Sequence, residues 1–123
     1  MQINSYKNLI VWQKGIVVCE RIYKVTESFP KEEIYGLTSQ MRRAAVSIPS
    51  NIAEGRNRSS RKDFINFLRI SLGSTAELET QIEIAKRLPQ TKHLSFEEIV
   101  ILLEEISKML STMISKLRIP PNS

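Results

Sequence analysis

Leu94–Leu117 reads LSFEEIVILLEEISKMLSTMISKL, and this segment has the clearest helical pattern in the chain. Ser95 and Glu98 have the spacing of a capping box, and Leu94 with Ile99 has the spacing of a hydrophobic staple, so a helix is expected to begin here. Apolar residues then recur every three or four positions, which predicts one buried face. They are Ile99, Leu103, Ile106, Leu110, Met113 and Leu117.

The preceding segment follows the same spacing. Ser60 is a suitable N-cap, Asp63 completes a weak capping box, and Pro89 ends the helix. Gly73 within it, like Gly15 nearer the N-terminus, is interpreted as a position of close helix packing, because glycine otherwise costs up to about 1 kcal/mol relative to alanine. The apolar face of this helix is predicted to contain Phe64, Leu68, Leu72, Thr75, Leu78, Ile82 and Ala85.

A further helix is expected to begin between Lys31 and Thr38 and to stop at Gly55, with residues 56–59 as the following loop. Its inner face is predicted to contain Ile34, Leu37, Met41, Ala45, Ile48 and Ile52. Pro49 interrupts this helix and leaves the carbonyl of Ala45 without its backbone partner. Polar side chains beside the proline are expected to cap the kink, with a ligand site as the alternative. These are Ser47, Ser50 and Asn51.

The N-terminal segment carries two apolar stripes. One contains Leu9, Trp12, Ile16, Cys19, Tyr23 and Thr26, and the other contains Val11, Val18, Ile22, Val25 and Phe29. Two stripes on one helix favour a further interface between subunits, since one bundle core does not usually cover both. The alternative is a helix at the centre of its own bundle. Phe29-Pro30 ends this helix, because the residue before proline is disfavoured in helical geometry.

Four amphipathic helices with short connections predict an all-α fold, an antiparallel up-down-up-down four-helix bundle over residues 1–119, with a short polar tail at 120–123. The 123 residues are 41% hydrophobic and 25% charged, as in single-domain globular proteins. A single cysteine, Cys19, excludes an internal disulfide framework and indicates a reducing compartment. The sequence has neither a secretory signal nor an apolar run of about 20 residues, so we expect a cytoplasmic protein.

Positive charge is concentrated in Arg42–Lys62, RRAAVSIPSNIAEGRNRSSRK. Six basic residues against Glu54 give this segment a net charge of +5, and the whole chain, with 18 basic and 13 acidic residues, also has +5. A basic segment on an otherwise balanced chain predicts contact with the phosphates of RNA or DNA. The candidate nucleic-acid-binding residues are Arg42, Arg43, Arg56, Arg58, Arg61 and Lys62.

A second class of function is a structural or protein-interaction ring scaffold without nucleic acid. Residues 77–105 hold seven acidic and three basic residues, and a basic end docking on this segment of a neighbour would close a ring or extend a filament. A nucleic-acid binder is expected to expose its arginines, whereas a scaffold would bury them against Glu77, Glu79 and Glu83. A solvated charged loop is the third interpretation.

Enzymatic chemistry has little support in the sequence. Glu54 is expected to pair with Arg42, Arg43 or Arg58 rather than to act as a catalytic carboxylate, because no second acid lies near it.

Arg87 and His93 have the Arg-x5-His spacing of HEPN-type helical ribonucleases, which leaves a small helical ribonuclease as a remote alternative. Pro89 lies between them and places His93 in a loop. Cys19 is interpreted as a small buried apolar residue. We therefore expect no catalytic residues, no cofactor and no metal site.

Three segments share the pattern of a known family. They are YKNLIVWQK at Tyr6–Lys14, FPKEEIYGLTSQMRRAAVSIPSNIAEG at Phe29–Gly55 and LGSTAELETQIEIA at Leu72–Ala85. The chain thereby resembles, over residues 6–118, the bacterial four helix bundle proteins, whose first members are encoded by intervening sequences within 23S ribosomal RNA genes. The matching positions around the proline are Arg42, Arg43, Ser47, Pro49, Ser50, Asn51, Glu54 and Gly55.

The resemblance implies a ring-like homopentamer of small all-α bundles, with no enzymatic activity to carry over. The family is also similar to the accessory protein of diversity-generating retroelements, a basic pentameric bundle, which implies nucleic acid and, by analogy, a reverse transcriptase as partners. The sequence thus predicts a non-enzymatic homo-oligomer that contacts RNA or DNA, without a membrane partner.

Overall fold

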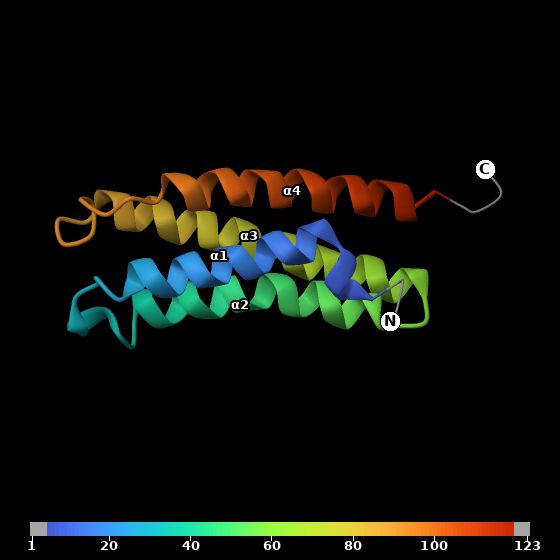
Figure 1. Ribbon diagram of the computed structural model, residues 1–123, viewed down its shortest axis with the longest axis horizontal. Helices are drawn as coiled ribbons and strands as arrows, with labels where there is room; N and C mark the ends of the chain where they lie inside the picture. Colours follow the sequence, from blue (N-terminus) through green and yellow to red (C-terminus); the bar gives the residue numbers. More distant parts are fainter. Residues whose placement is uncertain (1–4, 120–123) are drawn as a thin grey trace.

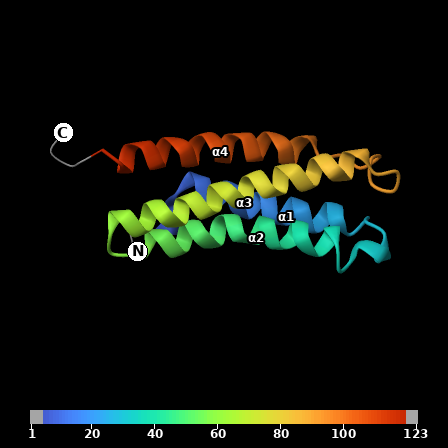
Figure 2. The same cartoon turned by 180° about the vertical axis from the view of Figure 1, so that it is seen from behind.

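The structure, a computed structural model, describes residues 5–119, and these form four long helices without a strand. Consecutive helices run in opposite directions (Figure 1), and the view from behind has the same arrangement (Figure 2). The expected all-α bundle is therefore confirmed, while the tail at 120–123 lies outside the described residues. The elements are η1 (Tyr6–Asn8), α1 (Ile10–Thr26), η2 (Lys31–Glu33), α2 (Leu37–Arg56), α3 (Arg61–Arg87) and α4 (Glu97–Leu117).

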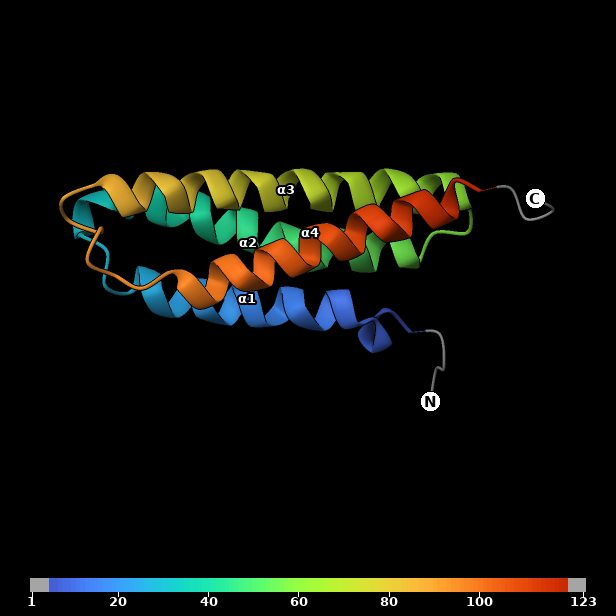
Figure 3. The same ribbon diagram turned by 90° about the horizontal axis from the view of Figure 1, so that it is seen from above.

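One apolar core runs the length of the bundle. α2 and α3 pack most extensively against each other, and α4 crosses obliquely from α1 to α3 (Figure 3). The stripes expected for α3 and α4 are buried or half-buried, whereas Ile34 lies before α2 and is half exposed, contrary to expectation. Of the two stripes on α1, the one with Val11, Val18 and Ile22 fills the core. In the other stripe, Ile16 and Tyr23 remain exposed, whereas Thr26 is buried.

The contact between α1 and α2 is built around Pro49. Gly15 of α1 leaves room for the proline ring, since a Cβ at this glycine would lie 3.3 Å from Pro49 Cβ and Cδ. One turn further along α1, the thiol of Cys19 donates a hydrogen bond to the carbonyl of Ala45 at 3.2 Å. This is the carbonyl that Pro49 cannot serve. Cys19, rather than the neighbouring polar residues, caps the interruption, so it is more than an apolar filler.

The thiol of Cys19 remains protonated under ordinary conditions. Burial raises its pKa to about 11. A hydrogen bond with the backbone opposes this rise, and the nearby charge of Glu20 adds to it. A protonated thiol is the form that can donate to a carbonyl, so the pKa and the geometry agree.

Hydrogen bonds between polar side chains link α2 to α3. The hydroxyls of Ser47 and Ser74 lie 2.8 Å apart, and the buried hydroxyl of Ser71 donates to the carbonyl of Ile48 at 2.9 Å. The side-chain amide of Asn51 donates to both the carbonyl and the hydroxyl of Ser47, each at 2.8 Å. The prediction that Ser47 and Asn51 cap the proline kink was therefore wrong, because they bond within α2 and across to α3.

Gly55 is buried inside α2 and does not stop the helix by a left-handed turn, because no glycine among the described residues has a positive φ. A Cβ at this position would lie 2.6 Å from the Cβ of Phe67. The glycine thus permits close approach of α3, and α2 ends one residue later at Arg56. Gly73, by contrast, has no atom of another helix within 4 Å of an added Cβ. The expectation of close packing there was wrong.

The two expected helix starts have different outcomes. Ser60 does cap α3, since its hydroxyl accepts from the amide of Asp63 at 3.0 Å. At α4 the capping box was wrong, because the helix begins at Glu97 with Phe96 as its N-cap residue and no side-chain cap. Phe96 is buried edge-on against Phe29, and Glu98 pairs with an arginine of α1 instead. Tertiary packing therefore sets this helix start.

Candidate nucleic-acid interface

The six basic residues singled out in the sequence do not form one surface. Arg42 and Arg43 lie near the start of α2, while Arg56 is its last residue. These 14 positions correspond to about 21 Å along the helix axis. The candidate set therefore divides into two groups, one near each end of α2.

Arg42 serves the fold. Its Nε donates to the hydroxyl of Thr26 at 2.9 Å, and its guanidinium lies 4.6 Å from the centre of the Tyr23 ring. Thr26 in turn donates to the carbonyl of Ile22 at 2.6 Å. Arg42 thus ties α2 to the last turn of α1, where a cation also complements the helix dipole.

Arg43 is exposed and, together with Arg42, lines a hollow of about 630 Å³ on the outer side of α1 and α2. It also lines a hollow of about 390 Å³ together with Gln40, Ala44, Ser47 and Glu77. A basic and an acidic side chain of the same chain therefore border this second depression.

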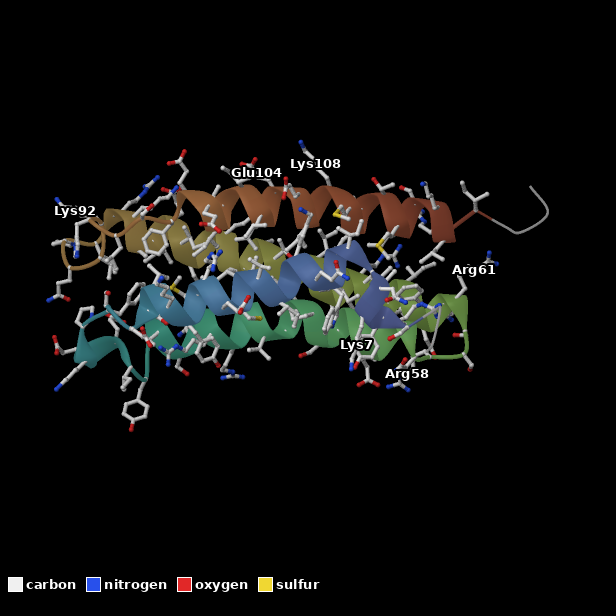
Figure 4. The ribbon with its side chains drawn as sticks, in the orientation of Figure 1. Lys7, Arg58, Arg61, Lys92, Glu104 and Lys108 are labelled. Atoms are coloured by element: carbon white, nitrogen blue, oxygen red, sulfur yellow. The ribbon has the colours of Figure 1, made fainter. Side chains whose placement is uncertain are left out.

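Arg56, Arg58, Arg61 and Lys62 gather where α2 connects to α3. Arg58 pairs with Glu54 at 3.0 Å and lies 5.0 Å from the centre of the Phe67 ring, which confirms the expected ion pair of Glu54. Arg61 Nη1 donates to the carbonyl of Ile119 at 3.2 Å. Figure 4 shows Lys7, Arg58 and Arg61 at this end of the bundle and Lys92 at the other.

The same end contains basic residues that the sequence argument missed. Arg69 and Arg118 join Arg61 and Lys62 around a cleft of about 360 Å³ between the start of α3 and the end of α4. The remaining lining residues are Ile65, Asn66 and Leu117. We call this the basic cleft.

The basic residues at this end greatly outnumber the acidic ones. Residues 7, 54–69 and 116–118 together hold eight basic and two acidic side chains, and we call this region the basic end. The other acidic residues of α3 and α4 lie outside the basic end. Among them, Glu79 has a raised pKa, first because its carboxyl is partly buried and second because Glu104 lies near it. The rest of the chain, with ten basic and eleven acidic residues, is therefore close to neutral.

The chain matches the family model described as 23S rRNA-intervening sequence protein over residues 7–112. It belongs to this family. A solved structure of a family relative is also similar, described as a protein of unknown function from the S23 ribosomal protein family of Bacteroides thetaiotaomicron. It is 30% identical, with a TM-score of 0.76, over 86% of this chain and 96% of that one. No curated protein matches the chain.

The positions that carry the family resemblance have mixed roles in this intervening-sequence protein. Pro49 and Gly55 shape helix contacts, and Ser47 with Asn51 joins α2 to α3. Ser50 is exposed and lines a hollow of about 630 Å³ on the outer side of α1 and α2. Most of the motif around the proline is thus explained by the packing of α2.

The residues with a ribonuclease-like spacing form no site in this family member. Arg87, the last residue of α3, pairs with Glu83 at 3.2 Å, and His93 lies exposed in the following turn. Within residues 5–119, no group of three His, Cys, Asp or Glu side chains could hold a metal ion. Over the same range, no helix is long and apolar enough to cross a membrane.

Proposed function

We propose that this protein is a non-enzymatic, cytoplasmic binding module that contacts the phosphates of RNA or DNA through its basic end. The observation that carries the proposal is the gathering of eight basic against two acidic side chains at one end of the bundle. Charge of one sign on a limited surface attracts polyanions, and arginine contacts phosphate with two parallel hydrogen bonds. Arg42 is excluded from the interface, because it is engaged with Thr26 and Tyr23.

Binding of this kind is mainly electrostatic. Phe64 and Phe67 are the aromatic residues at the basic end, but both are half-buried and Arg58 covers the ring of Phe67. Stacking of bases on exposed rings, which contributes about 1–3 kcal/mol per base, is therefore not available from these residues. We expect little sequence preference and a strong dependence of affinity on salt.

We also propose that the protein acts as a homo-oligomer, a pentamer by its family resemblance. Apolar side chains on the outer side of α1 and α2 support this, with exposed fractions of 36% for Ile16, 45% for Tyr23 and 41% for Val46. Such a surface is typical of a protein interface. A ring repeats the basic end in every subunit and raises avidity for one polyanion. The same apolar surface would equally serve a ring scaffold without nucleic acid, which is the second candidate.

The test is binding of labelled RNA and DNA over a salt series, with light scattering to determine mass. Replacing Arg56, Arg58 and Arg61 with alanine is expected to weaken binding and to flatten the salt dependence. The matched control replaces Lys86 and Arg87 at the other end of α3 and Lys92 in the turn that follows, and it should bind as the parent does. A stable oligomer that fails to bind at low salt would instead identify a scaffold.

A further inference from the structure

The basic cleft is formed by parts of the chain that are far apart in sequence. Its residues come from the first turns of α3 and from the last turn of α4, which lie side by side (Figures 1 and 3). We propose that this cleft holds the phosphates of a single nucleic-acid strand, with Arg69 and Arg118 as binding residues. This inference rests on the proposed function and specifies where the strand lies and in which form.

Charge in the basic cleft is not neutralised by the chain itself. The lining residues include four cations, Arg61, Lys62, Arg69 and Arg118, and no acid. None of the four forms an ion pair among the described residues, whereas Arg58 is paired with Glu54. Arg61 donates one hydrogen bond to the carbonyl of Ile119, and because a guanidinium has five N–H groups, other donors remain for a ligand. These side chains therefore favour an external anion.

The spacing along α3 fits a run of phosphates. Lys62 and Arg69 are seven residues apart and both line the cleft, which separates them by about 10.5 Å along the axis. Successive phosphates of one strand in a duplex rise about 3.4 Å, so two side chains at this separation reach different phosphates of one strand. Arg118 faces them from α4. A strand lying between the two helices would thus be contacted from both sides.

The lining of the cleft favours a single strand over a duplex. The cleft has a volume of about 360 Å³ and combines its four cations with apolar and amide side chains. Ile65 and Leu117 are half-buried and provide apolar surface within it, and Asn66 adds an amide. Sugars and bases have apolar faces that a single strand can lay against such a surface, while a duplex keeps its bases stacked inside.

The experiment compares two doubly substituted proteins that lose the same charge. Arg69→Gln with Arg118→Gln removes two cations from the cleft, and Arg87→Gln with Lys92→Gln removes two from the opposite end of the bundle. Each is titrated with a labelled oligothymidylate over a salt series, and a hairpin duplex with the same number of nucleotides serves as competitor. Circular dichroism verifies that both proteins remain helical.

The expected result is a smaller salt dependence for the cleft variant alone. Each lost phosphate contact reduces the slope of log affinity against log salt by about 0.7 for a single strand, so two lost contacts reduce it by about 1.4. The control should keep the parent slope, and the hairpin should compete poorly.

Three results would overturn the inference, and they can be told apart. An unchanged slope in the cleft variant, together with weaker binding by Arg56→Gln with Arg58→Gln, would leave the proposed function standing but place the strand elsewhere. Competition by the hairpin equal to that of the single strand would refute the preference for one strand. No binding by the parent protein at low salt would remove both proposals.

Discussion

Replacing Gly55 with alanine tests how closely α2 and α3 approach each other. The added Cβ would lie 2.6 Å from Phe67 Cβ and 3.1 Å from Phe64 Cδ1. Real Cβ atoms do not come this close, and Phe67 Cβ is fixed to the backbone of α3. The two helices must therefore move apart, which disturbs the most extensive helix contact of the bundle. Overpacking of this kind costs about 1–3 kcal/mol.

Helix propensity favours alanine and therefore opposes the cost of overpacking. The sign of the change in the free energy of unfolding thus shows which effect is larger. Alanine is favoured over glycine by about 1 kcal/mol in a helix interior, and by less near a helix end such as Gly55. Gly73→Ala is the matched control, because it lies mid-helix with nothing within 4 Å of the added Cβ. It should gain about 0.5–1 kcal/mol, whereas Gly55→Ala should show a net loss of about 1–2 kcal/mol.

Thermal and urea unfolding, followed by circular dichroism at equal protein concentration, measure both changes. For a chain of this size 1 kcal/mol shifts the melting temperature by roughly 4 °C, so the two variants should melt on opposite sides of the parent. Equal concentration matters because the proposed association of subunits would make the stability depend on protein concentration. If Gly55→Ala melts at or above the parent temperature, α2 and α3 are not in the close contact described, and the reasoning fails.

Three further predictions concern the contact between α1 and α2. Cys19→Ala should lower the free energy of unfolding, measured by urea titration, by about 1–3 kcal/mol, because the carbonyl of Ala45 loses its hydrogen-bond donor. Cys19→Ser keeps a donor at this position and should lower the free energy of unfolding by less. Burial raises the pKa of Cys19 from 9.0 to about 11 in the folded protein, so the thiol ionises at lower pH when the chain is unfolded. The stability of the parent should therefore fall as the pH rises from about 9 to about 11, whereas that of Cys19→Ser should not fall for this reason. Arg42→Ala should destabilise the fold by about 1–2 kcal/mol through loss of the bond to Thr26 and the contact with Tyr23, yet leave nucleic-acid affinity unchanged in the same titrations. Weaker binding by Arg42→Ala at full stability would return Arg42 to the interface.

The sequence predicts the helices well because their signals are local. Apolar spacing identified α3 and α4, and the hydroxyl of Ser60 caps its own helix as expected. The start of α4 was misjudged for a tertiary reason. Phe96 packs on Phe29, and Glu98 turns toward Arg21 of α1, so neither partner of the apparent capping box was free to cap. Such competition between local and distant partners is not visible in a pattern of spacing.

The candidate site was only partly predictable. Summing charge along the chain identifies Arg56–Lys62 as a basic segment, but it also includes Arg42, which lies about 21 Å away along α2 and bonds to α1. The same sum missed Arg69 and Arg118, since one lies two turns further along α3 and the other at the end of α4. Proximity of α3 and α4 at this end, which only the fold provides, brings them together.

The junction of Gly15, Cys19 and Pro49 has a consequence for how this sequence can change over time. Each residue compensates for another, because the glycine makes room for the proline ring and the thiol serves the carbonyl that the proline leaves free. If Pro49 became alanine, the helix would satisfy its own carbonyl and the need for a donor at Cys19 would disappear, while the Cβ at position 49 and the side chain of Ile48 would still lie against Gly15. The effects of substitutions at these three positions on stability are therefore non-additive. Which substitution a descendant of this chain could tolerate depends on which of the other positions had already changed.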